Sequence, residues 1–144
     1  MDKYDALKLE NQLCFPLYAA SREVIKQYRP FLDALDLTYT QCITMMVLWE
    51  NRQISVKELG QKLFLDSGTL TPVLKSLEAK GLVNRYRSVR DERVLIVEYT
   101  AEGLALRDKA ADIPERIAQC INLDKDEAYT LYSLLYKLLD SGEK

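Results

Sequence analysis

The hydrophobic pattern of this 144-residue chain changes its period at Gly81. Before this glycine, residues 67–80 repeat leucine and valine at three- and four-residue steps, which is the spacing of an amphipathic helix. After it, residues 82–87 and 93–99 are short runs rich in valine, isoleucine and tyrosine, separated by polar residues. Glycine commonly stops a helix directly after its last periodic residue. The pattern therefore predicts a helix that stops at Gly81 and is followed by a β-hairpin.

A second, short helix is expected just upstream. Ser55-x-x-Glu58 fits a capping box, and the residues behind it keep their apolar side chains on one face. A short helix, a tight turn, a second helix and a two-stranded hairpin make up a winged helix-turn-helix, so we expect residues 54–100 to form that unit. Paired helices before a hairpin also occur in domains that bind no nucleic acid, and the pattern alone leaves both interpretations open.

The N-terminal part of the chain is also predicted to be helical. Apolar residues over 9–28 follow helical steps, and Pro16, which a first turn tolerates, places the main helix start at Leu13 to Phe15. Pro30 is expected to open a short second helix, which the Asp36-Leu37 turn closes.

Three further capping patterns mark helix starts: Thr38-x-x-Gln41, Thr100-x-x-Gly103 and Asp124-x-x-Glu127. The first precedes the apolar run Ile43 to Trp49, which predicts a buried helix. The second begins a long helix toward Cys120, with a bend or break expected at Pro114. The third begins a last helix with an apolar stripe. The stripe consists of Leu131, Leu134, Leu135, Leu138 and Leu139.

These elements predict a mainly α fold with a small β-hairpin (α+β), in one domain over residues 1–144. The apolar and charged fractions, 48% and 29%, are those of ordinary globular proteins. Nothing approaches the ~20 apolar residues of a membrane span, and the first residues lack the order of a signal peptide. We therefore expect a cytoplasmic protein without a membrane partner.

Histidine is absent and cysteine occurs three times. Without histidine, the chain has no Ser–His or Cys–His nucleophile pair, histidine metal ligand or histidine pH switch. Three widely spaced cysteines without a CxxC pair do not suggest a disulfide framework or a cysteine-only zinc site. We expect no metal and no cofactor.

Charge is unevenly distributed along the chain. Residues 54–100 carry eight basic against six acidic side chains, whereas the remainder carries twelve against sixteen. On the helix before Gly81, burial of the apolar face leaves hydroxyls and a cation outward, suited to phosphates and base edges in a major groove. The hairpin adds an arginine cluster, of which Arg90 at the tip could enter a minor groove, although such clusters are often only solvated surface. The candidate DNA-binding residues are Ser67, Thr69, Thr71, Lys75, Arg85, Arg87 and Arg90, and Ser76 is also expected to face outward.

The stretch from Asp66 to Arg85, followed by Arg90-Asp-Glu-Arg93 and Thr100-Ala-Glu-Gly103, resembles the MarR family of bacterial transcription factors. The run Lys8 to Phe15, together with residues 65–72, resembles the organic-hydroperoxide-resistance repressors, a thiol-based branch of that family. The similarity covers almost the whole chain. It implies a dimer with a winged helix-turn-helix, in which Asp91 and Arg93 form a salt bridge that supports the hairpin, and residues 9–50 and 101–140 supply the dimerisation helices.

The three cysteines receive different interpretations. Cys42 lies in the buried-looking helix and is interpreted as a core residue. Cys14 is placed at a helix N-terminus, where unpaired amides favour a thiolate that peroxide can oxidise, although a buried cysteine is the plain alternative. The resemblance implies that Cys14 is the peroxide sensor, hydrogen-bonded by tyrosines of which some come from the partner subunit. The tyrosines at the corresponding places are Tyr18, Tyr28 and Tyr39.

The organic-hydroperoxide-resistance repressors, which the chain resembles, are of two types. In one, a single cysteine is inactivated by a mixed disulfide with a small thiol or by overoxidation; in the other, a C-terminal cysteine of the partner subunit resolves the oxidised sensor. Cys120 matches the second type in position, and an incidental helix cysteine remains the alternative.

The resulting hypothesis is a homodimeric repressor that binds pseudo-palindromic, double-stranded operator DNA and is released when organic hydroperoxide oxidises Cys14. One alternative is a MarR-type repressor that responds to phenolic or drug-like ligands, with incidental cysteines. Another is a thiol peroxidase using Cys14, which is disfavoured because such enzymes build their thiolate pocket on a βα scaffold and this chain predicts one hairpin of strand. We therefore expect no enzymatic activity.

Overall fold

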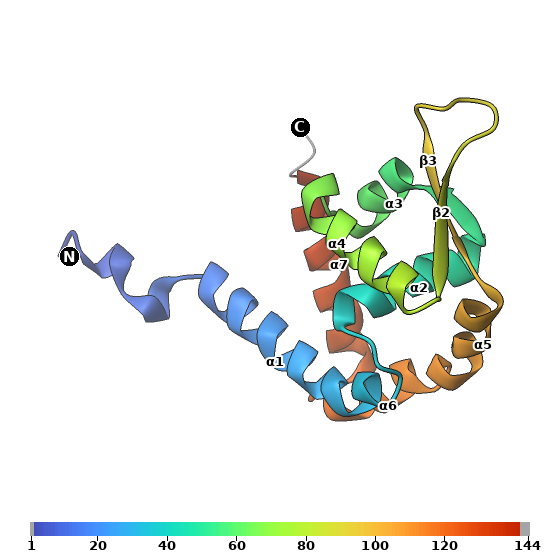
Figure 1. The fold of residues 1–144 in the computed structure, drawn as a ribbon. Coiled ribbons are helices and arrows are strands. Elements are labelled where there is room, and N and C mark those ends of the chain that lie inside the picture. The colour runs from blue at the N-terminus through green and yellow to red at the C-terminus, as the bar shows by residue number, and fades with distance from the viewer. Residues whose placement is uncertain (1, 142–144) are drawn as a thin grey trace. The chain divides into compact units, whose positions relative to one another are not determined.

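The computed structural model describes residues 2–141 (Figure 1). Contacts between residues divide the chain into the units Met1–Ile113 and Pro114–Lys144. Two 3-10 turns, η1 (Asp5–Leu7) and η2 (Leu9–Asn11), come first. The remaining elements, in chain order, are α1 (Cys14–Asp33), α2 (Tyr39–Asn51), β1 (Gln53–Ser55), α3 (Val56–Leu63), α4 (Ser67–Ala79), β2 (Val83–Arg87), β3 (Leu95–Tyr99), α5 (Ala101–Ala110), α6 (Ile113–Cys120) and α7 (Lys125–Ser141). The predicted fold class, mainly α with a small β part and a winged helix-turn-helix, is confirmed. Over residues 2–141, no helix is both long enough and apolar enough to cross a membrane.

The predicted hairpin is part of a three-stranded antiparallel sheet. Its strand order is β1-β3-β2, with Ile54 of β1 and Arg85 of β2 both opposite Val97 of β3. The prediction of two strands was wrong because it omitted β1. A strand of three residues, Gln53–Ser55, is too short to show the alternation that identifies a strand in a sequence.

α1 continues through Pro30 to Asp33, so the predicted short helix starting at Pro30 is wrong. The missing amide of Pro30 costs one hydrogen bond near the helix end, where the buried Leu32 anchors the last turn. The helix closes where Asp36 adopts a left-handed conformation, with φ of 56°, and the Leu37 amide donates to the Leu32 carbonyl at 3.0 Å. Backbone closure by Asp36, rather than the proline, therefore separates α1 from α2.

Side-chain caps are present at each of the four helix starts for which the sequence shows a capping pattern. Thr38 and Gln41 form a reciprocal capping box at α2, as do Asp124 and Glu127 at α7. Ser55 accepts from the Glu58 amide at 3.1 Å, and Thr100 accepts from the Gly103 amide at 3.0 Å. The break expected near Pro114 is also present, because α5 ends at Ala110 and Pro114 lies in the first turn of α6.

The end of α4 is closed as the sequence predicts. Gly81 has φ of 77°, its amide donates to Glu78 at 3.0 Å, and the Leu82 amide donates to Leu77 at 3.0 Å. These two bonds form a Schellman motif, which needs a residue with positive φ and therefore favours glycine. The motif turns the chain directly from α4 into β2.

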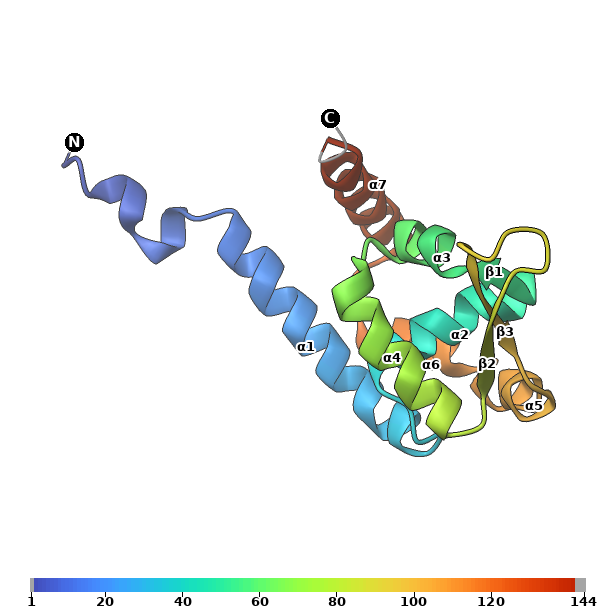
Figure 2. The ribbon, with the colours of Figure 1, turned by 45° about the horizontal axis from the view of Figure 1, so that its top comes forward.

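The core of the first unit lies between α2, α4 and the sheet, and α3 packs against both helices (Figure 2). Trp49 at the end of α2 donates its indole N–H to the Gly103 carbonyl at 2.8 Å, which ties α5 to α2. The core side chains with at most 1% exposure include Met45, Leu48, Leu59, Leu70, Leu74, Leu77, Val83 and Val97. Each fully buried leucine contributes about 1.5–3 kcal/mol to stability by leaving water.

An ion pair fastens β2 to α4. The Arg85 guanidinium donates to the Glu78 carboxylate at 3.1 Å, and the Arg85 backbone amide donates to the same group at 3.3 Å. These bonds hold the pKa of Glu78 below its usual range. The Arg85 side chain is 19% exposed, so it lies between helix and strand rather than in open solvent.

Substitution of Gly103 by alanine should destabilise the fold. A Cβ at this position would overlap the Leu82 carbonyl oxygen and lie 3.2 Å from the Met45 methyl. The overlap with Leu82 is the costly one, because it can be relieved only by moving the backbone of Leu82 or of α5. We expect a loss of about 1–3 kcal/mol in urea unfolding at fixed protein concentration. Gly68→Ala is the matched control, because its Cβ would meet only Asp66 at 3.5 Å. Equal unfolding midpoints for the two variants would contradict this packing.

The Glu78–Arg85 pair should contribute stability that depends on pH. A carboxyl whose pKa is lowered in the folded state stabilises the fold above its unfolded pKa, and this contribution disappears as the pH falls through the folded pKa. Glu78→Gln should therefore lower the urea midpoint near neutral pH, and the difference from wild type should shrink below about pH 4. Glu92→Gln, at an exposed position of the same hairpin, should show no such trend. A constant difference across the pH range would rule out the ion pair as its cause.

Candidate functional site

The outward face of α4 carries small hydroxyls and one cation. Its start is fixed by Asp66, whose carboxylate accepts from the Thr69 amide at 2.7 Å, a bond that lowers the pKa of Asp66. Ser67, Thr69 and Lys75 are exposed, as predicted. Thr71 is half-buried and donates its hydroxyl to the Ser67 carbonyl at 2.7 Å. This face can present hydroxyls and a positive charge to a large anionic surface.

Ser76 does not face outward, so that prediction was wrong. Its hydroxyl accepts a hydrogen bond from the Gln41 side chain at 2.8 Å and is turned toward α2. The positions of Leu74 and Leu77 on the helix place Ser76 at the margin of the buried face, where sequence spacing alone cannot distinguish solvent from a neighbouring helix.

The wing, residues 83–99, projects its loop beyond the sheet (Figure 1). Arg87 and Arg90 are exposed, whereas Arg85 is occupied by Glu78. The expected salt bridge is present: Arg93 donates to both oxygens of Asp91, at 3.1 and 3.2 Å, and holds the pKa of Asp91 below its usual range. Sequence alternation correctly put Arg85 and Arg87 on one face, but it could not show that α4 covers the first of them.

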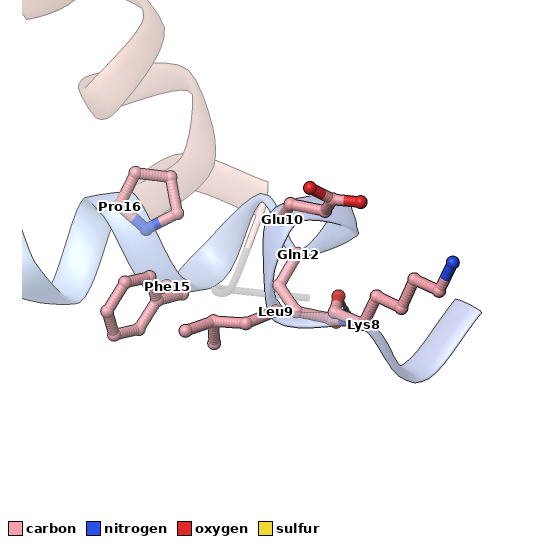
Figure 3. Close-up of a pocket in the computed structure, with 6 residues that line it drawn as sticks. All are labelled: Lys8, Leu9, Glu10, Gln12, Phe15 and Pro16. Atoms are coloured by element: carbon pink, nitrogen blue, oxygen red, sulfur yellow. Dashed lines mark hydrogen bonds between the residues drawn. The ribbon is translucent and has the colours of Figure 1, made fainter. Parts of the chain in front are cut away.

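Cys14 is the first residue of α1 and is exposed. Helix N-termini leave backbone amides unpaired, and Leu13 at the cap position supplies no side-chain acceptor for them. Residues on either side of Cys14 in the sequence line a hollow of about 660 Å³. The side chains of Leu9 and Phe15 face each other along it (Figure 3). Its lining consists of Lys8, Leu9, Glu10, Gln12, Phe15 and Pro16. Cys14 does not line the hollow, but it directly precedes Phe15 and Pro16, which do.

Tyr18 lies one helical turn from Cys14, on the same face of α1. The Arg22 guanidinium donates to the Tyr18 hydroxyl at 3.3 Å and lies 5.4 Å from the centre of its ring. Arg22 is not among the residues predicted from the sequence, although its four-residue spacing from Tyr18 was a signal that could have identified it. Arg22 is therefore able to orient Tyr18 and to place a positive charge near it.

Tyr28 and Tyr39 form a separate cluster at the other end of α1. Their ring centres are 4.9 Å apart in an edge-on arrangement. Burial raises the pKa of both tyrosines, and the neighbouring Cys42 adds to this effect. Tyr28 lies fourteen positions after Cys14 on the helix, which corresponds to ~21 Å along the axis. One chain alone therefore brings Tyr18 to Cys14 and does not bring Tyr28 there.

The other cysteines differ in exposure. Cys42 is 0% exposed, and burial raises its pKa, so the predicted core role is confirmed. Cys120 ends α6 in the second unit, is exposed, and lies 3.5 Å from the Arg116 carbonyl oxygen. Among residues 2–141, no cluster of three His, Cys, Asp or Glu side chains is arranged to hold a metal ion.

α7 displays large apolar side chains to solvent in the single chain. The exposed ones include Tyr129, Leu131, Tyr132, Leu134, Tyr136, Leu138 and Leu139. A surface helix normally exposes far fewer apolar groups, and a stripe of this size typically marks a protein contact.

Comparisons with known proteins agree with this geometry. A family model described as "Transcriptional regulator SarA/Rot" matches residues 26–110. The organic hydroperoxide resistance transcriptional regulator of Bacillus subtilis is 48% identical over 140 residues, covering 97% of this chain and 95% of the relative.

Solved structures of AbfR, from Staphylococcus epidermidis, match as well. Reduced AbfR bound to DNA has a TM-score of 0.79 and 33% identity, with 96% of each chain covered. Overoxidized AbfR bound to DNA has a TM-score of 0.78 and 34% identity, covering 97% of this chain and 98% of AbfR. Disulfide-formed AbfR has a TM-score of 0.67 and 32% identity, covering 99% and 97%. The sequence, the winged helix-turn-helix and these matches together show that the chain belongs to the MarR-like winged-helix transcriptional regulators, in the group of the organic hydroperoxide resistance and SarA/Rot regulators.

Proposed function

We propose that this chain is a peroxide-sensing repressor: the reduced homodimer binds a pseudo-palindromic operator, and oxidation of Cys14 by an organic hydroperoxide releases it. The observation that carries the proposal is an exposed cysteine at a helix N-terminus, directly before two residues that line a partly apolar hollow, in a chain that also has a winged helix-turn-helix. The hollow offers Leu9 and Phe15 to the carbon part of an organic hydroperoxide, a feature that hydrogen peroxide could not use.

The DNA-binding surface of the proposal combines α4 and the wing. Ser67, Thr69 and Lys75 would contact base edges and phosphates in a major groove, and Arg90 would reach a minor groove from the wing. Arg87 is assigned to the phosphate backbone because it is exposed at the end of β2. Thr71 supports the surface through its bond to Ser67. Arg85 positions the wing through Glu78 instead of contacting DNA.

The homodimer is inferred from the apolar stripe of α7, and the sensor site implied by the resemblance also needs it. The apolar stripe of α7 is exposed in the single chain, and a second copy would cover it with an equal stripe. The ~21 Å between Cys14 and Tyr28 means that Tyr28 and Tyr39 can act on a sensor thiolate only when they come from the partner subunit. A two-fold dimer would also present two α4 helices to half-sites about 34 Å apart.

The proposed redox chemistry has two steps. The Cys14 thiolate attacks the outer peroxide oxygen, the O–O bond breaks, and after protonation the products are a sulfenic acid and an alcohol. A second thiol then displaces hydroxide from the sulfenic sulfur, which gives a disulfide and water. We assign that thiol to the partner's Cys120, which is exposed at the end of α6.

The test is a gel mobility shift on the duplex upstream of the chain's own gene, with and without one equivalent of an organic hydroperoxide. Wild type should bind when reduced, lose the shift on treatment and run as a covalent dimer in nonreducing electrophoresis. Cys14→Ser should keep the shift after treatment and stay monomeric, because no sulfenic acid forms. Cys120→Ser should also stay monomeric, and it should retain more of the shift, since the disulfide cannot form.

Three outcomes would contradict parts of this proposal. A wild-type protein that stays monomeric and carries a small thiol by mass would make Cys120 incidental. Continuous peroxide consumption with a thiol reductant, instead of one event per subunit, would identify a thiol peroxidase. Release of Cys14→Ser from DNA by a phenolic compound would favour a ligand-responsive repressor.

Lys75→Ala and Arg90→Ala should each weaken binding to this duplex while leaving the fold intact, because both side chains are exposed. Loss of one phosphate contact should reduce the salt slope of binding by about one unit, whereas loss of a base contact should relax sequence preference. Lys109→Ala removes an equal charge from the exposed side of α5 and is the matched control. Wild-type affinity and salt dependence in both test variants would remove α4 and the wing from the DNA interface.

A further inference from the structure

Gln41 connects the first turn of α2 to the second half of α4. Its side chain is buried, with 5% exposure. Its amide nitrogen donates to the Ser76 hydroxyl at 2.8 Å, and its amide oxygen accepts from the Lys80 ammonium at 2.9 Å. Ser76 belongs to α4, and Lys80 is the C-cap of that helix. A buried amide with partners on a second helix fixes how the two helices lie, because displacing either one leaves a buried polar group unsatisfied.

The same side chain holds the start of α2. The Gln41 amide oxygen also accepts from the Thr38 backbone amide at 3.0 Å, which is one half of the capping box. Tyr39, which follows Thr38 in the sequence, packs edge-on against Tyr28 of α1, with 4.9 Å between the ring centres. The turn of α2 that carries Tyr39 is therefore the turn that carries Gln41. A displacement of the tyrosines relative to α4 strains the Gln41 bonds directly.

Lys80 extends the contact to the end of α1. Its ammonium donates to the Asp36 carbonyl oxygen and lies 3.8 Å from the Asp36 carboxylate. Asp36 is the left-handed residue that closes the helix beginning at Cys14. The end of α1, the start of α2 and the end of α4 thus meet at one small group of polar side chains, which consists of Asp36, Thr38, Gln41, Ser76 and Lys80.

We propose that Gln41 is the positioning residue that couples the redox state of Cys14 to the DNA-binding face of α4. The inference rests on the proposed function, because it names the residue through which that function is transmitted. Lys75 is the sequence neighbour of Ser76, so rotation of α4 about the Ser76–Gln41 bond reorients Lys75 and, one to two turns away, Thr69. Gln41 itself is buried and needs no contact with DNA or peroxide.

Two substitutions at Gln41 separate coupling from stability. Gln41→Leu keeps a similar volume and removes all three hydrogen bonds. Gln41→Glu keeps two oxygens that accept from the Thr38 amide, from Lys80 and from the Ser76 hydroxyl. Thr38→Ala is the control, since it weakens the capping box from the other side and leaves both bonds between Gln41 and α4. Thermal unfolding at matched concentration checks that each variant is folded.

The first readout is the ratio of the dissociation constants of hydroperoxide-treated and reduced protein for the chain's upstream duplex. The second is the protection of Cys14 from alkylation by saturating DNA, measured on the Cys14 peptide by mass, as a separate report of communication between the two sites. Gln41→Leu should bind DNA within about threefold of wild type when reduced, while its ratio falls about tenfold and the protection of Cys14 declines in step. Gln41→Glu and Thr38→Ala should keep the wild-type ratio.

A Gln41→Leu protein with the wild-type ratio and protection would overturn the inference while leaving the proposed function intact. If wild type itself binds DNA equally in both redox states, the proposed function fails and the inference fails with it. Should Gln41→Leu not fold, Ser76→Ala removes the same bond from the α4 side and must lower the ratio. A wild-type ratio in Ser76→Ala would then overturn the assignment.

Discussion

Burial of one face of α4 is the constraint on which the rest of the structure depends. Leu70, Leu74 and Leu77 are at most 1% exposed, and each contributes about 1.5–3 kcal/mol by leaving water. Because helix positions repeat every 3.6 residues, fixing this face also fixes which side chains point to solvent. Polar contacts at the two margins, Gln41 with Ser76 and Arg85 with Glu78, then set the rotation of the helix more finely than packing alone.

The parts of the fold that local chemistry determines were predictable from the sequence. Gly81 is required where φ is positive, and the cap at Thr38 needs only residues within one turn, so both appear in the sequence as short patterns. The errors have tertiary causes. Pro30 stays inside α1 because Asp36 and Leu32 close the helix later, and β1 exists because β3 pairs with it, not because its three residues favour a strand.

The residues of the candidate site likewise include some that spacing in the sequence predicts and others that only tertiary packing places. Cys14 at a helix start and Tyr18 four residues later follow from spacing, and Arg22 continues that series. The placement of Tyr28 with Tyr39 could not be predicted from spacing, because it depends on how α1 and α2 meet at Asp36. The two groups lie at opposite ends of one helix, and no side-chain rearrangement within a single chain can join them. Joining them requires a second copy, which a sequence pattern does not describe.

The size of the proposed switch favours a covalent constraint over a small chemical change at the thiol. To move a two-state regulator from about 1:99 to 99:1, oxidation must favour one state by about 5.5 kcal/mol. A sulfenic acid adds a single oxygen atom at the exposed Cys14 and exchanges hydrogen bonds worth about 0.5–1.5 kcal/mol each. A disulfide to another subunit instead requires the two Cα atoms to lie within about 7 Å of each other. Helices that are farther apart in the reduced dimer must move to meet this distance. α1 is a continuous helix of 20 residues, and Asp36 behind its far end accepts a hydrogen bond from Lys80 at the end of α4. In the proposed mechanism, a constraint imposed at Cys14 would therefore reach Lys80, which also donates to Gln41.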